Sequence, residues 1–359
     1  MCQVEQISKS SCYEIRLFFK RCGGRIPWGD TMNNSGKAWL IAFVMGMLIP
    51  GLMFSVSEKL IERDVEKPLT EPTAATQPIA QQPSQLPKAG VTVLTSDGPV
   101  VLDMQTYLTG VLLAEMPVDF SPEALKAQAV VSRTYALRQN TVGNKHSQGA
   151  VCTDSTCCQA YRSTEDFLLK GGTPELLTKV TEAVKSTDKQ VLTYNGVLIE
   201  ATYFSCSGGK TEDAMAVWGT DIPYLQSVSS PGEEGAAHFV DAVQFTAEEF
   251  ASLLGISPRG SASGWLGAVT YTEGGGVATM VIDGKTLSGT DIRQKLGLRS
   301  TVFTMLAVGD TIHISTRGYG HRVGMSQYGA EAMAVRGSDY PQILSHYYPG
   351  TRLSLYTQN

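Results

Sequence analysis

Basic residues are not in excess in this sequence. There are 29 Lys and Arg residues against 34 Asp and Glu, which gives a formal net charge of -5 at pH 7. No basic field therefore draws the chain toward nucleic acid, and we expect no nucleic-acid partner. The sequence also has neither the glycine-rich pattern of a phosphate-binding loop nor the G-x-S-x-G pattern of a hydrolase elbow. These absences argue against nucleotide-driven and serine-hydrolase chemistry.

Large apolar residues are scarce between residues 57 and 90. Five prolines stand there among Gln, Thr and Ala, namely Pro68, Pro72, Pro78, Pro83 and Pro87. This composition predicts an extended Pro-rich linker without a packed core. The linker leads into residues 91–359, which we expect to form one extracytoplasmic domain.

The segment before the linker predicts a membrane anchor. Residues 38–56 form an uncharged, mostly apolar run of about 19 residues, which suits one transmembrane helix. A signal peptide also has an apolar stretch, but this run is longer, and no small-x-small cleavage site follows it closely. Basic residues dominate residues 1–37. The positive-inside rule therefore keeps that segment in the cytoplasm and the rest outside. Met32 is an alternative start, and the first 31 residues would then not be translated.

The domain after the linker mixes helix and hairpin patterns. Strands are expected at 91–94 and 100–102, and at 191–194 and 198–204 around the turn Asn195-Gly196. A hairpin at 268–282 is also expected. Helices are expected over 107–115, from the Ser121 cap to about 140, over 174–187 and over 291–296. Because hairpins dominate and no strand–helix–strand alternation appears, the predicted fold class is α+β, with mixed helices and antiparallel hairpins.

Glu115 is the first candidate for chemistry. It ends an apolar helix, which Pro117 terminates, and so faces the negative end of the helix dipole. The dipole and the apolar neighbours both raise the pKa of this carboxyl, as a general acid requires. An exposed Glu at a helix end is the alternative. Lys126 and Arg133 lie seven residues apart on the next helix. They share one face, which could line a cleft beside Glu115 or could be a solvated surface.

One His and three thiols are concentrated within 13 residues. His146, Cys152, Cys157 and Cys158 could bind Zn²⁺, and a Cys152–Cys158 disulfide is the alternative in an oxidising exterior. Of the seven cysteines, Cys2, Cys12 and Cys22 precede the apolar run, and Cys206 follows the cluster.

Two Gly-containing segments could bind a ligand along the backbone. The first joins Tyr203, Ser207 and Glu212 to Trp218, and its aromatic faces suit sugar rings. Glu212 is a rival acid. The second, residues 317–330, includes Gln327. Tight turns are the alternative for both segments.

Taken together, these segments resemble the stage II sporulation protein D family. The resemblance rests on YLTGVLLAEMP, EALKAQAVVSRTYAL, residues 146–161, YFSCSGGKTEDAMAVWG, LSGTDIRQKLGLRST, GYGHRVGMSQYGAEAMA and HYYPGT. These motifs occur in the family's order and span roughly residues 91–355. Arg322 departs from the many relatives that have Gly after the His of this motif.

The resemblance implies a membrane-anchored lytic transglycosylase that cleaves peptide-stripped peptidoglycan during engulfment in endospore formation. Glu115 would be the acid/base. His146, Cys152 and Cys158 would bind a structural zinc, with Cys157 as an extra thiol. Expected substrate-binding residues are Lys126, Arg133, Tyr203, Ser207 and Gln327. Expected partners are stage II sporulation proteins P and M, in the mother-cell membrane facing the forespore.

Two other functions fit the same residues. Related domains include amidase enhancers, in which the cleft would bind glycan without cleaving it. The chain could also be a structural anchor with a degenerate cleft.

Overall fold

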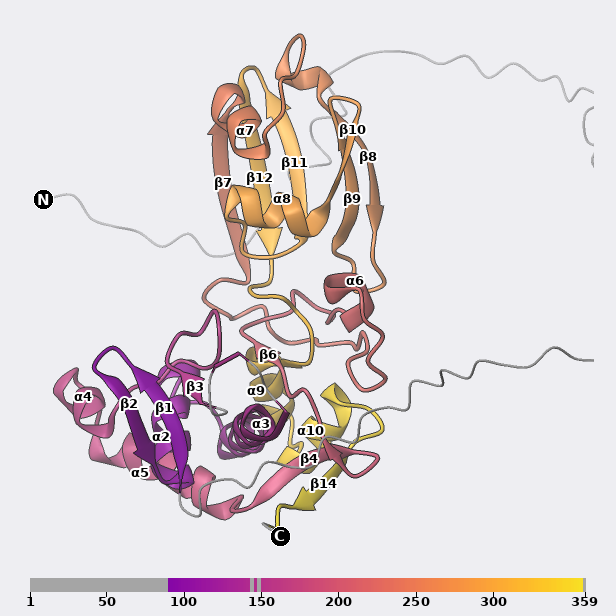
Figure 1. Ribbon diagram of the computed structural model, residues 1–359. Coiled ribbons are helices and arrows are strands. Elements are labelled where there is room, and N and C mark those ends of the chain that lie inside the picture. Colours follow the sequence, from indigo (N-terminus) through magenta and orange to yellow (C-terminus); the bar gives the residue numbers. More distant parts are fainter. Residues whose placement is uncertain (1–89, 143–144, 147–149, 358–359) are drawn as a thin grey trace, which may run out of the picture. The chain divides into compact units, whose positions relative to one another are not determined.

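The computed structural model describes residues 90–142, 145–146 and 150–357 (Figure 1). The expected cytoplasmic segment and membrane anchor, and all of the linker except its last residue, lie outside the described residues. Within the described part, no helix combines the length and apolar character that a bilayer span requires.

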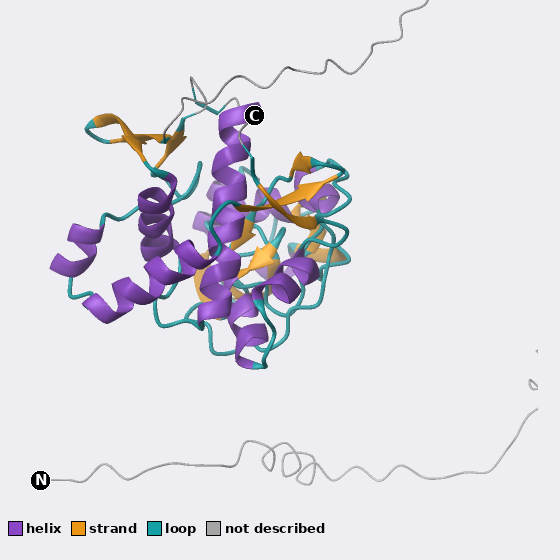
Figure 2. Cartoon of the chain, turned by 90° about the horizontal axis from the view of Figure 1, so that it is seen from below, coloured by secondary structure: helices purple, strands orange, loops and turns teal. Residues whose placement is uncertain are grey.

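Helices and short strands are mixed along the described chain (Figures 1 and 2). As far as residue 218 the elements are β1 Val91–Thr95, β2 Gly98–Leu102, α2 Met104–Glu115, α3 Pro122–Val142, β3 Val151–Cys152, α4 Thr164–Leu169, α5 Pro174–Ser186, β4 Gln190–Tyr194, β5 Val197–Leu198, β6 Tyr203–Phe204 and α6 Ala214–Trp218. After it come β7 Val240–Thr246, α7 Ala247–Leu254, η4 Ala262–Gly264, β8 Leu266–Tyr271, β9 Val277–Ile282, β10 Lys285–Ser288, α8 Gly289–Leu296, β11 Val302–Val308, β12 Thr311–Arg317, β13 Met325–Ser326, α9 Gln327–Val335, α10 Tyr340–Tyr347 and β14 Arg352–Leu355.

The strands form small, mainly antiparallel sheets. Their orders are β2-β1-β3, β10-β9-β8, β11-β12-β7, β13-β6 and β14-β4-β5. Two short pairs, β1 with β3 and β6 with β13, are parallel. The mixed class with antiparallel hairpins is therefore confirmed. Asn195 and Gly196 have positive φ of 50° and 80°, as a tight two-residue hairpin turn requires.

The second strand of that hairpin is shorter than the sequence pattern predicts. β5 ends at Leu198, and β6 at Tyr203–Phe204 pairs with β13 instead of β4. Glu200, between them, accepts a hydrogen bond on its carboxylate from Arg138 Nε at 2.6 Å. Its backbone N–H donates to the Tyr224 hydroxyl. These tertiary contacts draw the chain away from β4, so the prediction of one strand over 198–204 is wrong.

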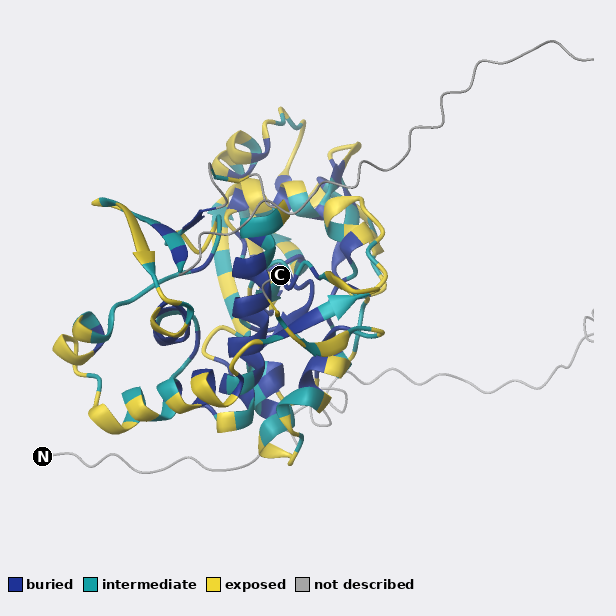
Figure 3. Cartoon of the chain, turned by 60° about the horizontal axis from the view of Figure 1, so that its bottom comes forward, coloured by how far each residue is buried: buried dark blue, intermediate teal, exposed yellow. Residues whose placement is uncertain are grey.

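The first hydrophobic core surrounds α3. This helix begins at Pro122 and is buried along most of its length, as the dark blue positions in Figure 3 illustrate. Ala129, Ser132 and Ala136 are fully buried, and their small size lets neighbouring elements approach closely. The core takes side chains from α2, α3, α5, β4, α9 and α10, so it combines residues from both ends of the described chain.

A second, separate core lies entirely within residues 250–314. It draws its buried side chains from α7, β9, β10, α8, β11 and β12. α7 starts with a capping box in which Thr246 and Glu249 bond each other's backbone N–H groups. The two cores share no buried residue. Glu115 ends α2, which is an element of the first core.

Candidate active site and metal centre

Glu115 is the last residue of α2. The helix starts at the Asp103 cap, whose side chain accepts from Thr106 N, and ends where Met116 turns to an extended conformation before Pro117. Glu115 lines a cavity of about 910 Å³ together with residues from α3, from the segment after β3, from β6, from α6 and from the segment after β12. The volume is at the upper end for ligand pockets, which suits an elongated ligand.

The Glu115 carboxylate is held in one orientation. Its Oε1 accepts a hydrogen bond from the backbone N–H of Ala160 at 2.5 Å. Burial raises the pKa of Glu115 above its ordinary value of 4.5, while the backbone N–H of Ala160 and the nearby Tyr203 hydroxyl act in the opposite direction. The net shift is upward, as the sequence predicts, and burial is its largest cause. A carboxyl with a raised pKa keeps its proton to higher pH and can act as an acid.

A buried polar network supports Glu115. The Tyr203 hydroxyl donates to Gln159 Oε1 at 3.3 Å, and Gln159 Nε2 donates to the Tyr107 hydroxyl at 3.0 Å. Gln159 is fully buried, and it lies between Cys158 and Ala160 in the chain. Gln159 is not among the candidate residues that the motifs of the sequence offer. Its position beside the last thiol of the cluster was the signal available.

Four further residues give the cavity its polar and aromatic walls. Gln327, at the start of α9, and Trp218, at the end of α6, line it as the sequence predicts. Tyr319 and His321 line it as well. Burial lowers the pKa of His321 to about 4, so this imidazole is neutral at pH 7. The aromatic rings and the neutral imidazole offer flat, uncharged surfaces to a ligand.

Three expected substrate-binding residues do not line this cavity. Lys126 pairs with Glu123 at 2.6 Å, one helical turn away. Arg133 is buried, and its guanidinium donates to the carbonyls of Val184 and Gln190. Because these partners belong to α5 and β4, Arg133 ties α3 to its neighbours and does not reach Glu115. This corrects the expectation that Lys126 and Arg133 line a cleft beside the acid.

Ser207 also has a structural environment. Its backbone N–H and its hydroxyl both donate to Glu233 Oε2, at 2.6 and 2.8 Å. Gly208 N–H donates to the same oxygen. Ser207 is fully buried and helps to fix the turn after β6, outside the residues that line the cavity.

The rival acid, Glu212, is engaged elsewhere. Its Oε1 accepts from Arg322 Nη1 at 3.0 Å, and both side chains are 1% exposed. Glu212 does not line the cavity. Arg322 adopts a positive φ of 67° and donates further to carbonyl oxygens of Ser207, Lys210 and Gly274. Glu212 is therefore a structural carboxylate, and of the two candidate acids, Glu115 and Glu212, only Glu115 lines the cavity.

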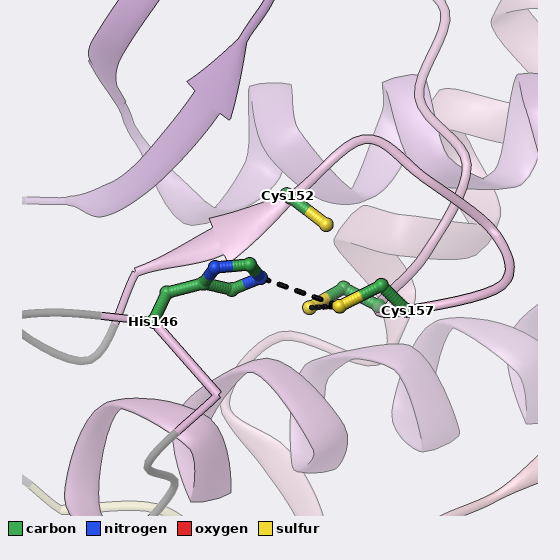
Figure 4. Close-up of side chains that lie close together, drawn as sticks. His146, Cys152 and Cys157 are labelled. Carbon is green, nitrogen blue, oxygen red and sulfur yellow. Dashed lines mark hydrogen bonds between the residues drawn. The ribbon is translucent and has the colours of Figure 1, made fainter.

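The His and Cys side chains of the 146–158 segment converge. One ligand atom from each of His146, Cys152, Cys157 and Cys158 lies within 4.8 Å of the others. Figure 4 shows His146, Cys152 and Cys157 pointing toward one another, with His146 Nε2 at 3.4 Å from Cys157 Sγ. The cysteines that the structure describes are free thiols, so the alternative Cys152–Cys158 disulfide is not formed. Cys157 joins the cluster as a fourth ligand group, which the sequence analysis left as an extra thiol.

This donor set fits a metal ion. One imidazole and three thiolates are a common combination for four-coordinate structural zinc. Cys157 and Cys158 also border the cavity that contains Glu115. The cluster is thus close to the candidate acid in the fold, and Gln159 and Ala160 connect the two directly.

Comparison with known proteins identifies the family of this chain. Residues 99–194, which contain Glu115 and the His/Cys cluster, match the family model described as stage II sporulation protein. The chain is 44% identical over 258 residues to stage II sporulation protein D of Bacillus subtilis, covering 70% of this chain and 75% of that protein. The chain belongs to the stage II sporulation protein D family.

Other relatives extend the family comparison. Stage II sporulation protein D of Bacillus amyloliquefaciens is 43% identical over 259 residues, which cover 70% of this chain and 74% of that protein. The amidase enhancer of Bacillus subtilis is 29% identical over 308 residues, covering 69% of this chain and 40% of the enhancer. The chain is thus a member of a family of sporulation proteins.

Proposed function

We propose that the cavity around Glu115 binds peptidoglycan glycan strands and that the chain is a lytic transglycosylase. Its reaction would cleave the bond between N-acetylmuramic acid and N-acetylglucosamine in peptide-stripped strands. The product would be a 1,6-anhydromuramic end. In the cell this activity would serve engulfment during endospore formation.

The observation that carries this function is a single unpaired carboxylate in a large cavity. Among the described residues that line it, the carboxylates are Glu115 and Glu200. Glu200 is bound to Arg138 in an ion pair of 2.6 Å. Ordinary glycosidases need two working carboxyl groups, an acid and a nucleophile or base. A site with one available carboxyl favours a reaction in which the substrate supplies its own nucleophile.

The proposed reaction uses Glu115 twice. Glu115 first gives its proton to the glycosidic oxygen, and the bond between that oxygen and C1 of the muramic residue breaks. The C6 hydroxyl oxygen of the same residue then attacks C1. Glu115, now a carboxylate, takes the proton from that hydroxyl. No water is consumed, and Glu115 ends in its starting protonation state.

Zinc is the metal that we propose for the cluster of His146, Cys152, Cys157 and Cys158. With four protein ligands the ion would have no open position, so its role would be structural. Bound zinc would fix the segment that ends in Gln159 and Ala160. Ala160 would thereby present its N–H to Glu115.

The N-terminal sequence and the family support a proposal for the cellular setting. We propose that residues 38–56 anchor the chain in the mother-cell membrane and that the domain from residue 91 faces the forespore. Its partners would be stage II sporulation proteins P and M. Protein P would act as the amidase that removes stem peptides before the glycan is cut.

The test uses the full chain, purified in mild detergent and incubated with peptide-stripped glycan strands. Mass spectrometry should detect anhydromuramic products from the wild type. Glu115→Gln should reduce their rate by at least about 100-fold while it keeps glycan binding, because only the proton transfer is removed. Glu212→Gln is not a control for the acid, since its ion pair supports the fold. Glu200→Gln is the matched cavity variant and should retain most of the activity.

A second function is favoured by one comparison, the match to an amidase enhancer. Under this alternative the cavity binds glycan and stimulates a separate amidase, and Glu115 transfers no proton. A folded wild type that binds strands, yields no anhydro ends and accelerates an added amidase would support it. The structural-anchor alternative predicts instead that Glu115→Gln leaves sporulation unaffected.

A further inference from the structure

Lys145 contributes a fixed positive charge to the wall of the cavity. Its ammonium donates hydrogen bonds to the Cys157 carbonyl at 2.6 Å and to the Tyr135 hydroxyl at 3.1 Å. Lys145 lines the same cavity as Glu115. These contacts position an ammonium that would otherwise move freely on its long side chain.

The other charges that line the cavity leave Lys145 uncompensated. Glu200 is paired with Arg138, and Glu115 accepts its hydrogen bond from the backbone N–H of Ala160 and not from Lys145. His321 is uncharged at pH 7. Within the described part of the chain, Lys145 forms no ion pair with a carboxylate. Two of its three N–H groups have acceptors, so one donor remains available for a ligand.

Lys145 and Glu115 face the same short segment of chain. Lys145 binds the carbonyl of Cys157, and Glu115 accepts from the N–H of Ala160, three residues further on. Three residues span at most about 11 Å. A ligand that contacts Glu115 with one group can therefore reach Lys145 with another group of the same sugar residue or its neighbour.

We propose that Lys145 binds the free lactyl carboxylate of muramic acid and thereby makes the site selective for peptide-stripped strands. This inference rests on the proposed function, in which the cavity holds a glycan strand. Removal of the stem peptide leaves a carboxylate on the lactyl group, whereas a strand that keeps its peptide has an uncharged amide at that position. Lys145 attracts the first and gains no ion pair from the second. The substrate-binding role expected for Lys126 and Arg133, which lie outside the cavity, thus passes to Lys145. This residue belongs to the metal loop, the segment from Lys145 to Cys158 that contains the His/Cys cluster.

The metal loop explains why the charge is held there. Lys145 directly precedes His146, and its acceptor carbonyl belongs to Cys157. Lys145 is therefore joined to the cluster by its peptide bond to His146 and by its hydrogen bond to the Cys157 carbonyl. In this way the same segment that presents Ala160 to the acid presents a cation to the substrate.

The test compares two ligands that differ in one functional group. The first is a peptide-stripped glycan fragment with its lactyl carboxylates free. The second is the same fragment with those carboxylates converted to methylamides. Binding of each to the full chain in detergent is measured by calorimetry with Glu115→Gln as the background, so that no cleavage occurs.

In Glu115→Gln with Lys145 intact, the fragment with free carboxylates should bind about tenfold more tightly than the methylamide fragment. The methylamide cannot form the charged hydrogen bond with the Lys145 ammonium. Lys145→Met and Lys145→Gln should bind both fragments with equal, weaker affinity, and Lys145→Arg should keep the preference. Lys285→Met, an exposed lysine on β10, is the matched control and should behave as the background does.

The outcomes separate this inference from the function on which it rests. Equal binding of both fragments in the Lys145-containing background, or an unchanged preference in both neutral Lys145 variants, overturns the role of Lys145 and leaves glycan binding intact. A folded background that binds neither fragment overturns the proposed function and this inference with it. Zinc content and thermal unfolding of each variant establish that the metal loop is still folded.

Discussion

Arg322 and Glu212 form a buried ion pair of 3.0 Å in which each side chain is 1% exposed. The guanidinium is otherwise surrounded by carbonyl oxygens, including that of Gly274 at 2.6 Å. Gly274 lies in the turn between β8 and β9, so the pair connects the loops of the first core to a hairpin of the second. Arg322 holds a positive φ, a conformation in which Gly is the usual residue. The contacts of the guanidinium compensate for that backbone strain.

Removing one partner of this pair should destabilise the fold strongly. We expect Glu212→Gln to lower the free energy of unfolding by about 3 to 5 kcal/mol, because Arg322 stays buried without an opposite charge. Arg322→Gly should also destabilise, and the double variant should lose less than the sum of the two. Urea denaturation measures all three. Strictly additive losses would mean that the two residues are not coupled. Glu273→Gln, in an exposed ion pair with Lys210, should have a much smaller effect.

The raised pKa of Glu115 predicts a pH-dependent stability. The folded state binds this proton more tightly than the unfolded state, so stability should fall as pH rises from the ordinary value of 4.5 through the raised value. In Glu115→Gln this decline should be absent. The free energy of unfolding of both proteins, measured by urea denaturation from pH 4 to 8, gives the difference. A difference that does not change with pH would show that burial leaves the Glu115 pKa unshifted.

Cys157, the additional thiol of the cluster, should determine how tightly the proposed zinc is bound. Changes beside a metal site alone lower affinity by about 10 to 100-fold, so loss of a thiolate ligand in Cys157→Ser should exceed about 100-fold. Competition with a chromophoric chelator measures the affinity. Cys206→Ser, a buried thiol outside the cluster, is the control. If Cys157→Ser holds zinc as tightly as Cys206→Ser, the ligands are His146, Cys152 and Cys158 alone, as the sequence resemblance implies.

Trp218 should contribute to glycan affinity. Its side chain is 43% exposed and lines the cavity, where a sugar ring can stack on the indole. We expect Trp218→Ala to weaken binding of peptide-stripped fragments by about tenfold. Tyr271→Ala removes an aromatic that is 61% exposed and lies outside the cavity, and it should leave binding unchanged. Equal losses in the two variants would contradict a specific stacking role.

Local signals in the sequence predicted much of the first core correctly. The Ser121-Pro122 start located α3, and Asn195-Gly196 located the β4–β5 turn, because caps and tight turns depend on residues close in sequence. The end of α2 at Glu115 followed in the same way from Pro117. These features need no knowledge of the rest of the fold.

The predictions that failed concern residues whose contacts lie far away in the sequence. Lys126 and Arg133 share a helix face, but whether that face meets a cavity or a neighbouring helix is decided by α5 and α10. Gln159 carries no motif of its own and gains its role only when α2 and β6 bring Tyr107 and Tyr203 to it. The place of Cys157 in the cluster could not be predicted, because residue spacing alone does not show which thiols of a loop point toward a common centre.

The residues of the two cores are complete at different points of synthesis. The second core needs only residues 250–314, whereas the first spans Val91 to Tyr348. On a ribosome that makes the chain from its N-terminus, α2 and α3 emerge early and must wait for α9 and α10, while the later-made second core can close first. A chain interrupted after Arg317 would contain the acid and the whole second core but not His321 or Gln327. Under the proposed function, interrupted synthesis would therefore release an inert fragment and not an active one that cuts glycan strands.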